Sequence, residues 1–305
     1  MTTEAIEVDG LRMRYGANDV LRDVTFQAHR GEVLALLGPN GAGKTTTIEI
    51  LEGFRTRSAG RVTVLGADPA DGDERWRARV GVVLQSWRDH SKWRVRELLA
   101  HQGAYYARHS TARRRRPWDT DELIAAVGLT EHAGKRLKTL SGGQRRRLDV
   151  AIGMVGRPEM LFLDEPTAGF DPQARHDFHD LIRDLAAAGD TTILLTTHDL
   201  PEAEKLAGRI LILTEGRIVA DGTAEELARQ IVGEDEVRWT LHGQRHERTA
   251  RDSTRFVFDL FKEHGDAVSH LEVRPSSLEN TYLSLVHRAE SGEKRTESGG
   301  KEAVA

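Results

Sequence analysis

Residues 32–46, EVLALLGPNGAGKTT, pass from a short apolar run into a glycine-rich turn and then into a predicted helix. The turn matches the pattern G-x-x-x-x-G-K-[ST], in which glycines let backbone N–H groups surround phosphate oxygens and the following helix directs its positive end at them. The lysine adds a charge for the outer phosphates, and the threonine offers a hydroxyl to Mg²⁺. A plain glycine-rich turn is the alternative, but a strand before it and a helix after it favour phosphate. The predicted phosphate loop consists of Gly38, Pro39, Asn40, Gly41, Ala42, Gly43, Lys44, Thr45 and Thr46.

Short apolar runs bounded by turn residues recur along the chain and predict buried strands. They lie at 32–37, 80–84, 160–163, 191–196 and 209–213. Because helical stretches separate them, they indicate a parallel sheet that is covered on both faces. The early segments 4–15, 20–29 and 60–65 alternate apolar and polar residues, which indicates an antiparallel sheet beside the parallel one. The expected fold class is α/β, a phosphate-loop NTPase core with an antiparallel β subdomain.

The remaining segments suggest two additions to this core. Residues 86–158 contain helical patterns and no convincing strand, so we expect a helical insertion within a first domain at 1–224. Residues 225–288 predict a small α+β region, with strands near 236–242 and 267–274 and helices near 253–265 and 276–288. The tail 289–305 has few apolar residues, and we expect it to be disordered.

Composition narrows the class of protein. The 305 residues carry a formal net charge of −4, which gives no electrostatic case for nucleic acid as a partner. Cysteine is absent, which favours an intracellular protein without disulfides. The amino-terminal residues lack the apolar stretch of a signal peptide, and no apolar run approaches the roughly 18 residues of a membrane span. Any membrane role is therefore expected to come through a partner.

Polar residues follow three further predicted strands, where ligands bind in open α/β sheets. Asp164 suits Mg²⁺, and Glu165 beside it can orient or deprotonate a water molecule. His198 can contact a terminal phosphate, and Gln85 can reach Mg²⁺ or water. Taken alone, the acidic pair is more simply a helix cap and the histidine a structural group. The phosphate loop at the same sheet edge reverses that preference.

A second phosphate-binding pattern lies almost a hundred residues after the first. In LSGGQRRRLDV, residues 140–150, Ser141 and Gln144 fit a capping box at the start of a helix. The capping box does not explain Gly142 and Gly143, because glycine in a first helical turn is unfavourable unless something must approach the backbone closely. A phosphate at the helix N-terminus would do so.

Five motifs in this order resemble the nucleotide-binding subunit of an ABC transporter: GPNGAGKTT, LSGGQ, LFLDEP, AGFD and TTHD. The resemblance covers about residues 4–220 and implies an ATPase that uses ATP and Mg²⁺. It implies that Tyr15 stacks on adenine. It implies that phosphate and Mg²⁺ are contacted by Lys44, Thr45, Gln85 and Asp164. It also implies that Glu165 is the catalytic base and that His198 senses the γ-phosphate. It also implies that the subunits pair head to tail, so that LSGGQ of one copy closes over the nucleotide on the other's phosphate loop, with Asp171 in the loop between the two sites.

The resemblance extends to a branch of the family that exports drugs, of the daunorubicin-resistance type, through PTAGFDPQAR and the carboxyl-terminal SLENTYLSLV. It implies a separate transmembrane permease and a peripheral place on the cytoplasmic face of the membrane. Residues 86–100 are expected to face that permease. The run Arg113–Arg116 is expected to be a solvated loop, with contact to lipid head groups as the alternative.

Two other functions are weighed against export. One is a soluble ABC-type ATPase acting on ribosomes or DNA, but such proteins usually carry two of these domains or long coiled coils. The other is a phosphate-loop kinase, which would leave LSGGQ and His198 without a role. The sequence names no transported substrate.

Overall fold

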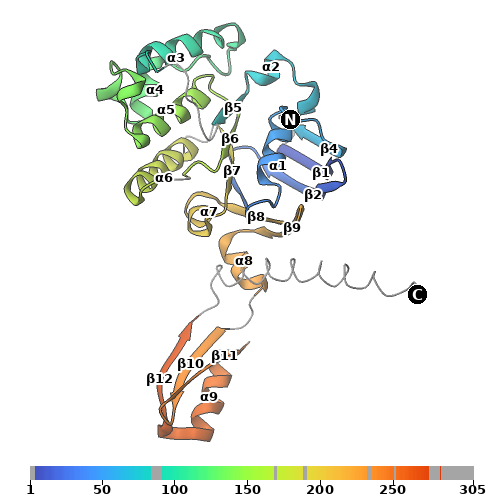
Figure 1. Cartoon of the computed structure of the whole chain (residues 1–305), viewed down its shortest axis with the longest axis vertical. Coiled ribbons are helices and arrows are strands. Elements are labelled where there is room, and N and C mark those ends of the chain that lie inside the picture. The colour runs from blue at the N-terminus through green and yellow to red at the C-terminus, as the bar shows by residue number, and fades with distance from the viewer. Residues whose placement is uncertain are drawn as a thin grey trace, which may run out of the picture. The chain divides into compact units, whose positions relative to one another are not determined.

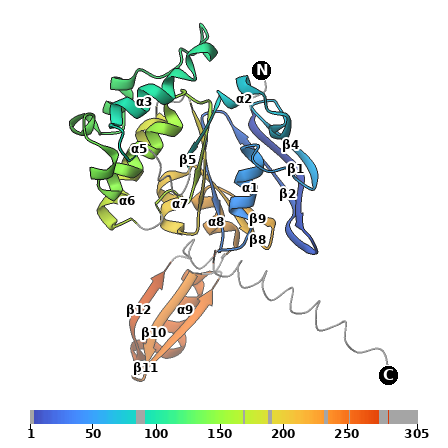
Figure 2. The ribbon, with the colours of Figure 1, turned by 45° about the horizontal axis from the view of Figure 1, so that its top comes forward.

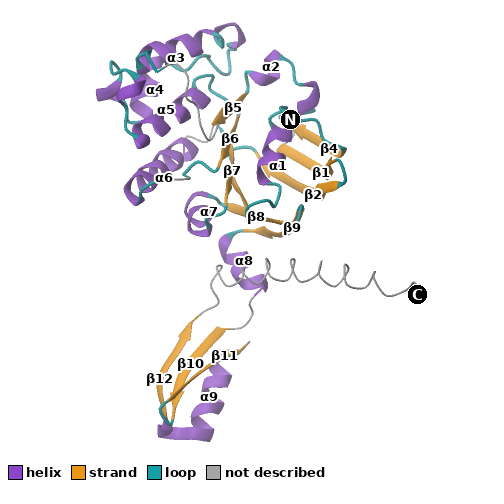
Figure 3. Cartoon of the chain, viewed as in Figure 1, coloured by secondary structure: helices purple, strands orange, loops and turns teal. Residues whose placement is uncertain are grey.

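The computed structural model of the chain describes residues 4–83, 91–167, 170–187, 191–231, 235–250, 252–274 and 282. The chain divides into two compact units, Met1–Val219 and Ala220–Ala305. Figure 3 shows the helices and strands of both units. No helix in the described part of the chain is long and apolar enough to cross a membrane.

The first unit is built around a six-stranded sheet. Its order is β5 (Val80–Val83), β6 (Met160–Asp164), β7 (Thr192–Thr197), β3 (Val33–Leu37), β8 (Arg209–Thr214) and β9 (Arg217–Gly222). The pairs from β5 to β8 are parallel, and their apolar residues are buried on both faces of the sheet. This confirms the buried parallel sheet that the short apolar runs predicted, because a parallel sheet covered by helices needs no polar face. The sequence analysis did not anticipate β9.

A three-stranded antiparallel sheet lies beside the parallel one, as the alternating segments predicted. Its order is β2 (Asn18–His29), β1 (Glu4–Tyr15) and β4 (Ala59–Val64). The apolar residues of its inner face join one core with α1 (Lys44–Leu51) and with strands of the parallel sheet. Helix α1 contacts both β4 and β6, so it lies between the two sheets (Figure 1). The core therefore fixes the helix that follows the phosphate loop.

The expected helical insertion lies on the other side of the parallel sheet (Figure 2). It contains α3 (Val95–Ala104), α4 (Thr120–Ala126) and α5 (Gly142–Met154), which contact one another, and α5 also packs on β5. Asp119 and Ser141 cap the starts of α4 and α5 with their side chains. The other helices of this unit are α2 (Glu74–Arg77), α6 (Pro172–Ala187) and α7 (Leu200–Leu206).

The run Arg113–Arg116 is only in part the solvated loop that its charge predicted, because Arg113 and Arg115 are exposed but Arg114 and Arg116 are not. Arg116 is buried, and its Nε donates to the Gly156 carbonyl at 2.9 Å. Arg114 Nη1 donates to the Pro158 carbonyl at 2.8 Å. The prediction was wrong for these two residues because their acceptors are backbone carbonyls some forty residues further along the chain, which a local charge pattern cannot reveal.

The second unit is a small α+β fold. It contains α8 (Ala224–Ile231), a sheet in the order β11 (Gln244–Ala250), β10 (Asp235–Leu241) and β12 (Val268–Arg274), and α9 (Ser253–His264). Trp239 of β10 packs edge-on against Phe256 of α9, with ring centroids 5.4 Å apart. Strand β11 was missed because its sequence, QRHERTA, has no apolar alternation. The predicted helix at 276–288, apart from Tyr282, and the predicted disordered tail at 289–305 lie outside the described residues.

Candidate functional site

The predicted phosphate loop connects the carboxyl end of β3 to α1. Gly43 precedes α1 with a left-handed φ of 105° and offers no side-chain cap, so the first N–H groups of the helix remain available to an anion. A Cβ at Gly43 would lie 2.6 Å from Leu21 Cδ2, and a Cβ at Gly38 would lie 2.2 Å from the Leu213 carbonyl oxygen. The surrounding protein itself therefore requires glycine at both positions.

Lys44 extends back across the loop from the first turn of α1. Its Nζ donates to the carbonyl oxygens of Gly38 and Pro39 at 2.8 and 3.1 Å and lies 3.5 Å from Glu165 Oε1. The side chain is only 5% exposed, and burial lowers the pKa of Lys44 while the charge of Glu165 opposes that shift. A phosphate entering the loop would offer this ammonium a stronger partner than two carbonyls.

Asp164 and Glu165 follow β6 at the same edge of the sheet. Thr45 Oγ1 donates to Asp164 Oδ2 at 3.2 Å, so a hydroxyl and a carboxylate from two elements converge. Such a set of oxygens fits Mg²⁺, a hard cation that binds few protein carboxylates and completes its shell with phosphate and water. Glu165 has a positive φ of 41°, which is uncommon for a residue with a side chain and occurs often at functional sites.

Thr196, which the sequence analysis did not single out, fixes the positions of both acidic residues. It pairs with Asp164 in the parallel register of β6 and β7 and is fully buried. Its Oγ1 donates to Asp164 Oδ1 at 2.5 Å and accepts from the Glu165 N–H at 2.9 Å. The hydroxyl of a threonine in a buried apolar strand needs a hydrogen-bond partner. That requirement was the one feature of the sequence that could have identified Thr196 as a functional residue.

His198 follows β7 and lies where it was predicted, beside the acidic pair. Its Nδ1 lies 3.5 Å from Glu165 Oε1, and the side chain is 52% exposed. The turn that carries it is held by buried Glu202, whose carboxylate accepts from Thr197 Oγ1 at 2.5 Å and from Thr167 Oγ1 at 2.6 Å. His198 therefore lies on a fixed turn with its ring open to a ligand.

Tyr15 ends β1 and is 41% exposed. The Arg55 guanidinium lies over one side of its ring, 5.1 Å from the centroid. The sequence analysis did not single out Arg55. Gln85 lies outside the described residues.

The second phosphate-binding pattern opens α5 and borders a separate cavity of about 700 Å³. Ser141 and Gln144 form the predicted capping box: Ser141 Oγ accepts from the Gln144 N–H at 3.3 Å, and Gln144 Oε1 accepts from the Ser141 N–H at 3.0 Å. Asp171 lines the same cavity, and no residue of the phosphate loop 38–46 does so. Apart from Tyr15 and the undescribed Gln85, the predicted site residues thus form two groups, one around Lys44 and one around Ser141.

The two glycines of this pattern differ from those of the phosphate loop. A Cβ at Gly142 would meet nothing within 4 Å, and a Cβ at Gly143 would make an ordinary contact of 3.6 Å with Ala174 Cβ. Neither has the left-handed φ that favours glycine. In the described part of the chain, nothing requires glycine at these two positions.

Comparisons with known proteins agree with this geometry. The model of a family described as ABC transporter matches residues 21–168. The Nod factor export ATP-binding protein I of Cupriavidus pinatubonensis is 36% identical in an alignment of length 302, which covers 94% of this chain and 92% of that protein. The daunorubicin resistance ATP-binding protein DrrA3 of Streptomyces coeruleorubidus is 41% identical over 234 residues, which are 77% of this chain and 73% of that protein.

Solved structures have the same fold as the first unit. The structure of an ATP-binding subunit of an ABC transporter aligns with a TM-score of 0.62 and 29% identity, over 74% of this chain and 92% of that one. An ATP-binding cassette in its ADP conformation aligns with a TM-score of 0.63 at 22% identity, over 74% of this chain and 93% of that one, and this likeness concerns the fold alone.

Proposed function

Because this chain belongs to the family of ABC transporter ATP-binding subunits, which are ATPases, we propose that two copies pair head to tail around two ATP molecules and drive export through a separate membrane permease. Each ATP would lie between the phosphate loop of one copy and residues 141–144 of the other. The observation that carries this proposal is the difference between the two glycine pairs. Gly38 and Gly43 are required by the chain's own packing, whereas Gly142 and Gly143 leave backbone open to a ligand.

The residues around Lys44 can be given roles from their contacts. The Lys44 ammonium is shared between two carbonyls and Glu165, and phosphate would draw it away from them. Glu165 would then be free to accept a proton from the attacking water as general base. His198, whose ring is half exposed beside Glu165, would contact the terminal phosphate.

Mg²⁺ is expected to be held by Thr45, Asp164 and Gln85, and when bound it would neutralise charge on the phosphate oxygens. The hydrogen bond between Thr45 and Asp164 supports this assignment, because it brings two oxygen ligands together before the ion is present. Tyr15 would stack on adenine. Asp171, which lines the cavity at Ser141, would contribute to the site formed with the second copy.

The exported substrate is proposed from the named relatives, which serve daunorubicin resistance and Nod factor export. We expect a drug-like or hydrophobic substrate here as well. The chain would work at the cytoplasmic face of the membrane, held there by the permease.

A Glu165→Gln variant tests the proposed site. It keeps the contacts to phosphate but lacks the base, whose removal typically lowers the rate by about 10²–10⁴. We expect the variant to bind ATP with Mg²⁺, to hydrolyse it poorly and to elute as a dimer in size-exclusion chromatography. Glu204→Gln, at an exposed position on α7, is the matched control and should behave like wild type. Hydrolysis near the wild-type rate, or no ATP-dependent dimer, would contradict the proposal.

A further inference from the structure

A second cavity, of about 780 Å³, lies at the edge of the parallel sheet opposite to the phosphate loop. Arg79 and Glu159 line it, and each directly precedes a strand: β5 begins at Val80 and β6 at Met160. Arg30, in the turn before β3, lines it as well. The cavity is therefore at the amino ends of these strands, whereas the phosphate loop follows the carboxyl end of β3. It is distinct from the nucleotide site.

The lining of this cavity is strongly cationic. Its arginines come from the turn before β3, from α2 and the residues after it, and from the loop that follows α3. They are Arg30, Arg75, Arg79, Arg108, Arg113, Arg114 and Arg116. Among the described residues that line the cavity, Glu159 is the one carboxylate. We call this surface the arginine cavity.

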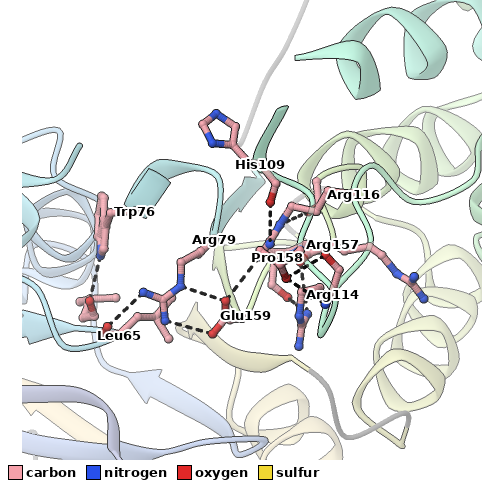
Figure 4. A network of polar contacts seen from close by, with 12 residues as sticks. Leu65, Trp76, Arg79, His109, Arg114, Arg116, Arg157, Pro158 and Glu159 are labelled. Carbon is pink, nitrogen blue, oxygen red and sulfur yellow. Dashed lines mark hydrogen bonds and ion pairs between the residues drawn. The ribbon is translucent and has the colours of Figure 1, made fainter. Parts of the chain in front are cut away.

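Glu159 lies at the centre of a network that holds several of these arginines (Figure 4). Arg79 binds it through two nitrogens at 2.9 and 3.0 Å, Arg30 at 3.2 Å and Arg116 at 3.4 Å. Burial would raise the pKa of Glu159, but these hydrogen bonds and the charges around it outweigh burial and lower the pKa to about 2. One carboxylate is therefore shared by three guanidinium groups.

The inner arginines are built into the fold. The Arg116 side chain is only 3% exposed and also donates to the Gly156 carbonyl, and Arg114 donates to the carbonyls of Arg157 and Pro158. Burial lowers the pKa of Arg116, the charge of Glu159 opposes that shift, and the charges of Arg114 and Arg79 add to it. Holding like charges together at this depth costs stability, so the cluster is not explained by stability alone.

A purely structural role explains some of these residues and not others. It accounts for Arg114 and Arg116, which join the loop after α3 to the residues before β6, and for Arg79, which donates to the Leu65 carbonyl. It does not account for Arg75, which is exposed at the cavity and adds positive charge to a surface that already has a large excess.

We propose that the arginine cavity binds a compact anion that carries two or more phosphate groups. Guanidinium groups match phosphate oxygens with paired, charge-assisted hydrogen bonds, and several of them around one concave site favour a multiply charged ligand. A volume of about 780 Å³ fits a ligand of the size of a small metabolite or a lipid head group. Both sources present the same chemistry, and the experiment separates them.

The test compares two double variants of the full-length chain with equal changes in charge. Arg75→Gln/Arg113→Gln removes two exposed arginines that line the cavity. Arg77→Gln/Arg115→Gln removes exposed arginines from the same two segments that do not line it. The soluble probe is inorganic triphosphate, measured by titration calorimetry. The membrane probe is vesicles of phosphatidylglycerol with phosphatidylcholine, measured by co-sedimentation against vesicles of phosphatidylcholine alone.

We expect the cavity variant to bind at least one probe about tenfold or more weakly than wild type, because each lost arginine removes a charge-assisted contact, while the control variant binds within about twofold of wild type. If the cavity variant binds triphosphate more weakly, the ligand is a soluble anion. If only its binding to anionic vesicles is weaker, the ligand is a lipid head group. Triphosphate that binds the phosphate loop contributes equally to all three proteins. Equal losses in both variants, or no binding of either probe to wild type, would overturn the proposal, and neither result bears on the nucleotide site.

Discussion

Replacing Thr196 by Val should weaken both the fold and hydrolysis, because one buried hydroxyl positions the two acidic residues of the nucleotide site. Valine has nearly the same shape, so the substitution removes hydrogen bonds without opening a cavity. Asp164 loses a donor at 2.5 Å, and the Glu165 N–H loses its acceptor at 2.9 Å. The backbone of Glu165, which is already in an uncommon conformation, then lacks the contact that fixes it.

The size of the effect can be estimated from these contacts. A buried polar group left without a partner costs about 1–3 kcal/mol. Asp164 keeps the Thr45 hydroxyl and is partly exposed, so we take the lower end for each group and expect about 2 kcal/mol in total. For a domain of this size that corresponds to a decrease in Tm of about 4–8 °C. Displacement of the base should lower kcat by about tenfold to a hundredfold.

The measurement is thermal unfolding together with steady-state ATP hydrolysis and ATP binding. Affinity for ATP should change little, since the Lys44 contacts remain, and this separates a positioning role from a general loss of structure. Thr214→Val is the matched control: Thr214 is buried at the end of β8, on the far side of β3 from β7, and its hydroxyl has no hydrogen-bond partner among the described residues. That variant should be as stable as wild type or more so. The reasoning is refuted if Thr196→Val retains the Tm and kcat of wild type, or if both variants lose equally.

Three further outcomes are expected. Tyr15→Ala should weaken ATP binding by about 1–3 kcal/mol while Tyr15→Trp largely preserves it, as measured by equilibrium titration, and equal severe losses with the fold intact would argue against stacking. Because the pKa of Glu159 is lowered from 4.5 to about 2, its contribution to stability is full above about pH 4.5 and disappears as the pH falls toward 2. This contribution of Glu159 to stability should amount to about 3 kcal/mol. Glu159→Gln should therefore flatten the pH dependence of the unfolding free energy below about pH 4.5, and an unchanged pH dependence would contradict the lowered pKa. Gly143→Ala should keep or raise stability by up to about 1 kcal/mol in chemical denaturation but reduce ATP-driven dimerisation, and a loss of stability would mean that the glycine serves the fold instead.

Much of the nucleotide site could be predicted because its residues are recognisable from their type and from the predicted strands and helix next to them in the sequence. The glycines of the phosphate loop lie between an apolar strand and a helix, and Asp164, Glu165 and His198 each follow a strand of the same sheet. The parallel topology brings these strand ends together without further information. The same reasoning recovered the antiparallel sheet and the helical insertion.

The features that were missed depend on partners far away in the sequence. Thr196 resembles any threonine in a strand until its register with Asp164 is known. Arg114 and Arg116 resemble a solvated basic run, but their acceptors lie about forty residues further along the chain. Strand β11 carries polar residues because its side chains are mostly exposed, so the alternation that reveals a strand is absent.

The central claim is that each nucleotide site is shared between two copies, and mixing two variants tests it most directly. Lys44→Ala removes the charge at the phosphate loop, and Ser141→Arg blocks the opposing loop, so each homodimer has one damaged half in every site. In a mixed dimer of the two, one site carries both defects and the other carries none.

The comparison is a Lys44→Ala/Ser141→Arg double variant mixed with wild type, in which every shared site has one defect. With differently tagged copies, the measured quantity is ATP-driven association between the two tags. The account predicts more association in the mixture of single variants than in the mixture of double variant and wild type. The reverse ranking would mean that each chain uses its own two loops, and it would contradict the head-to-tail arrangement.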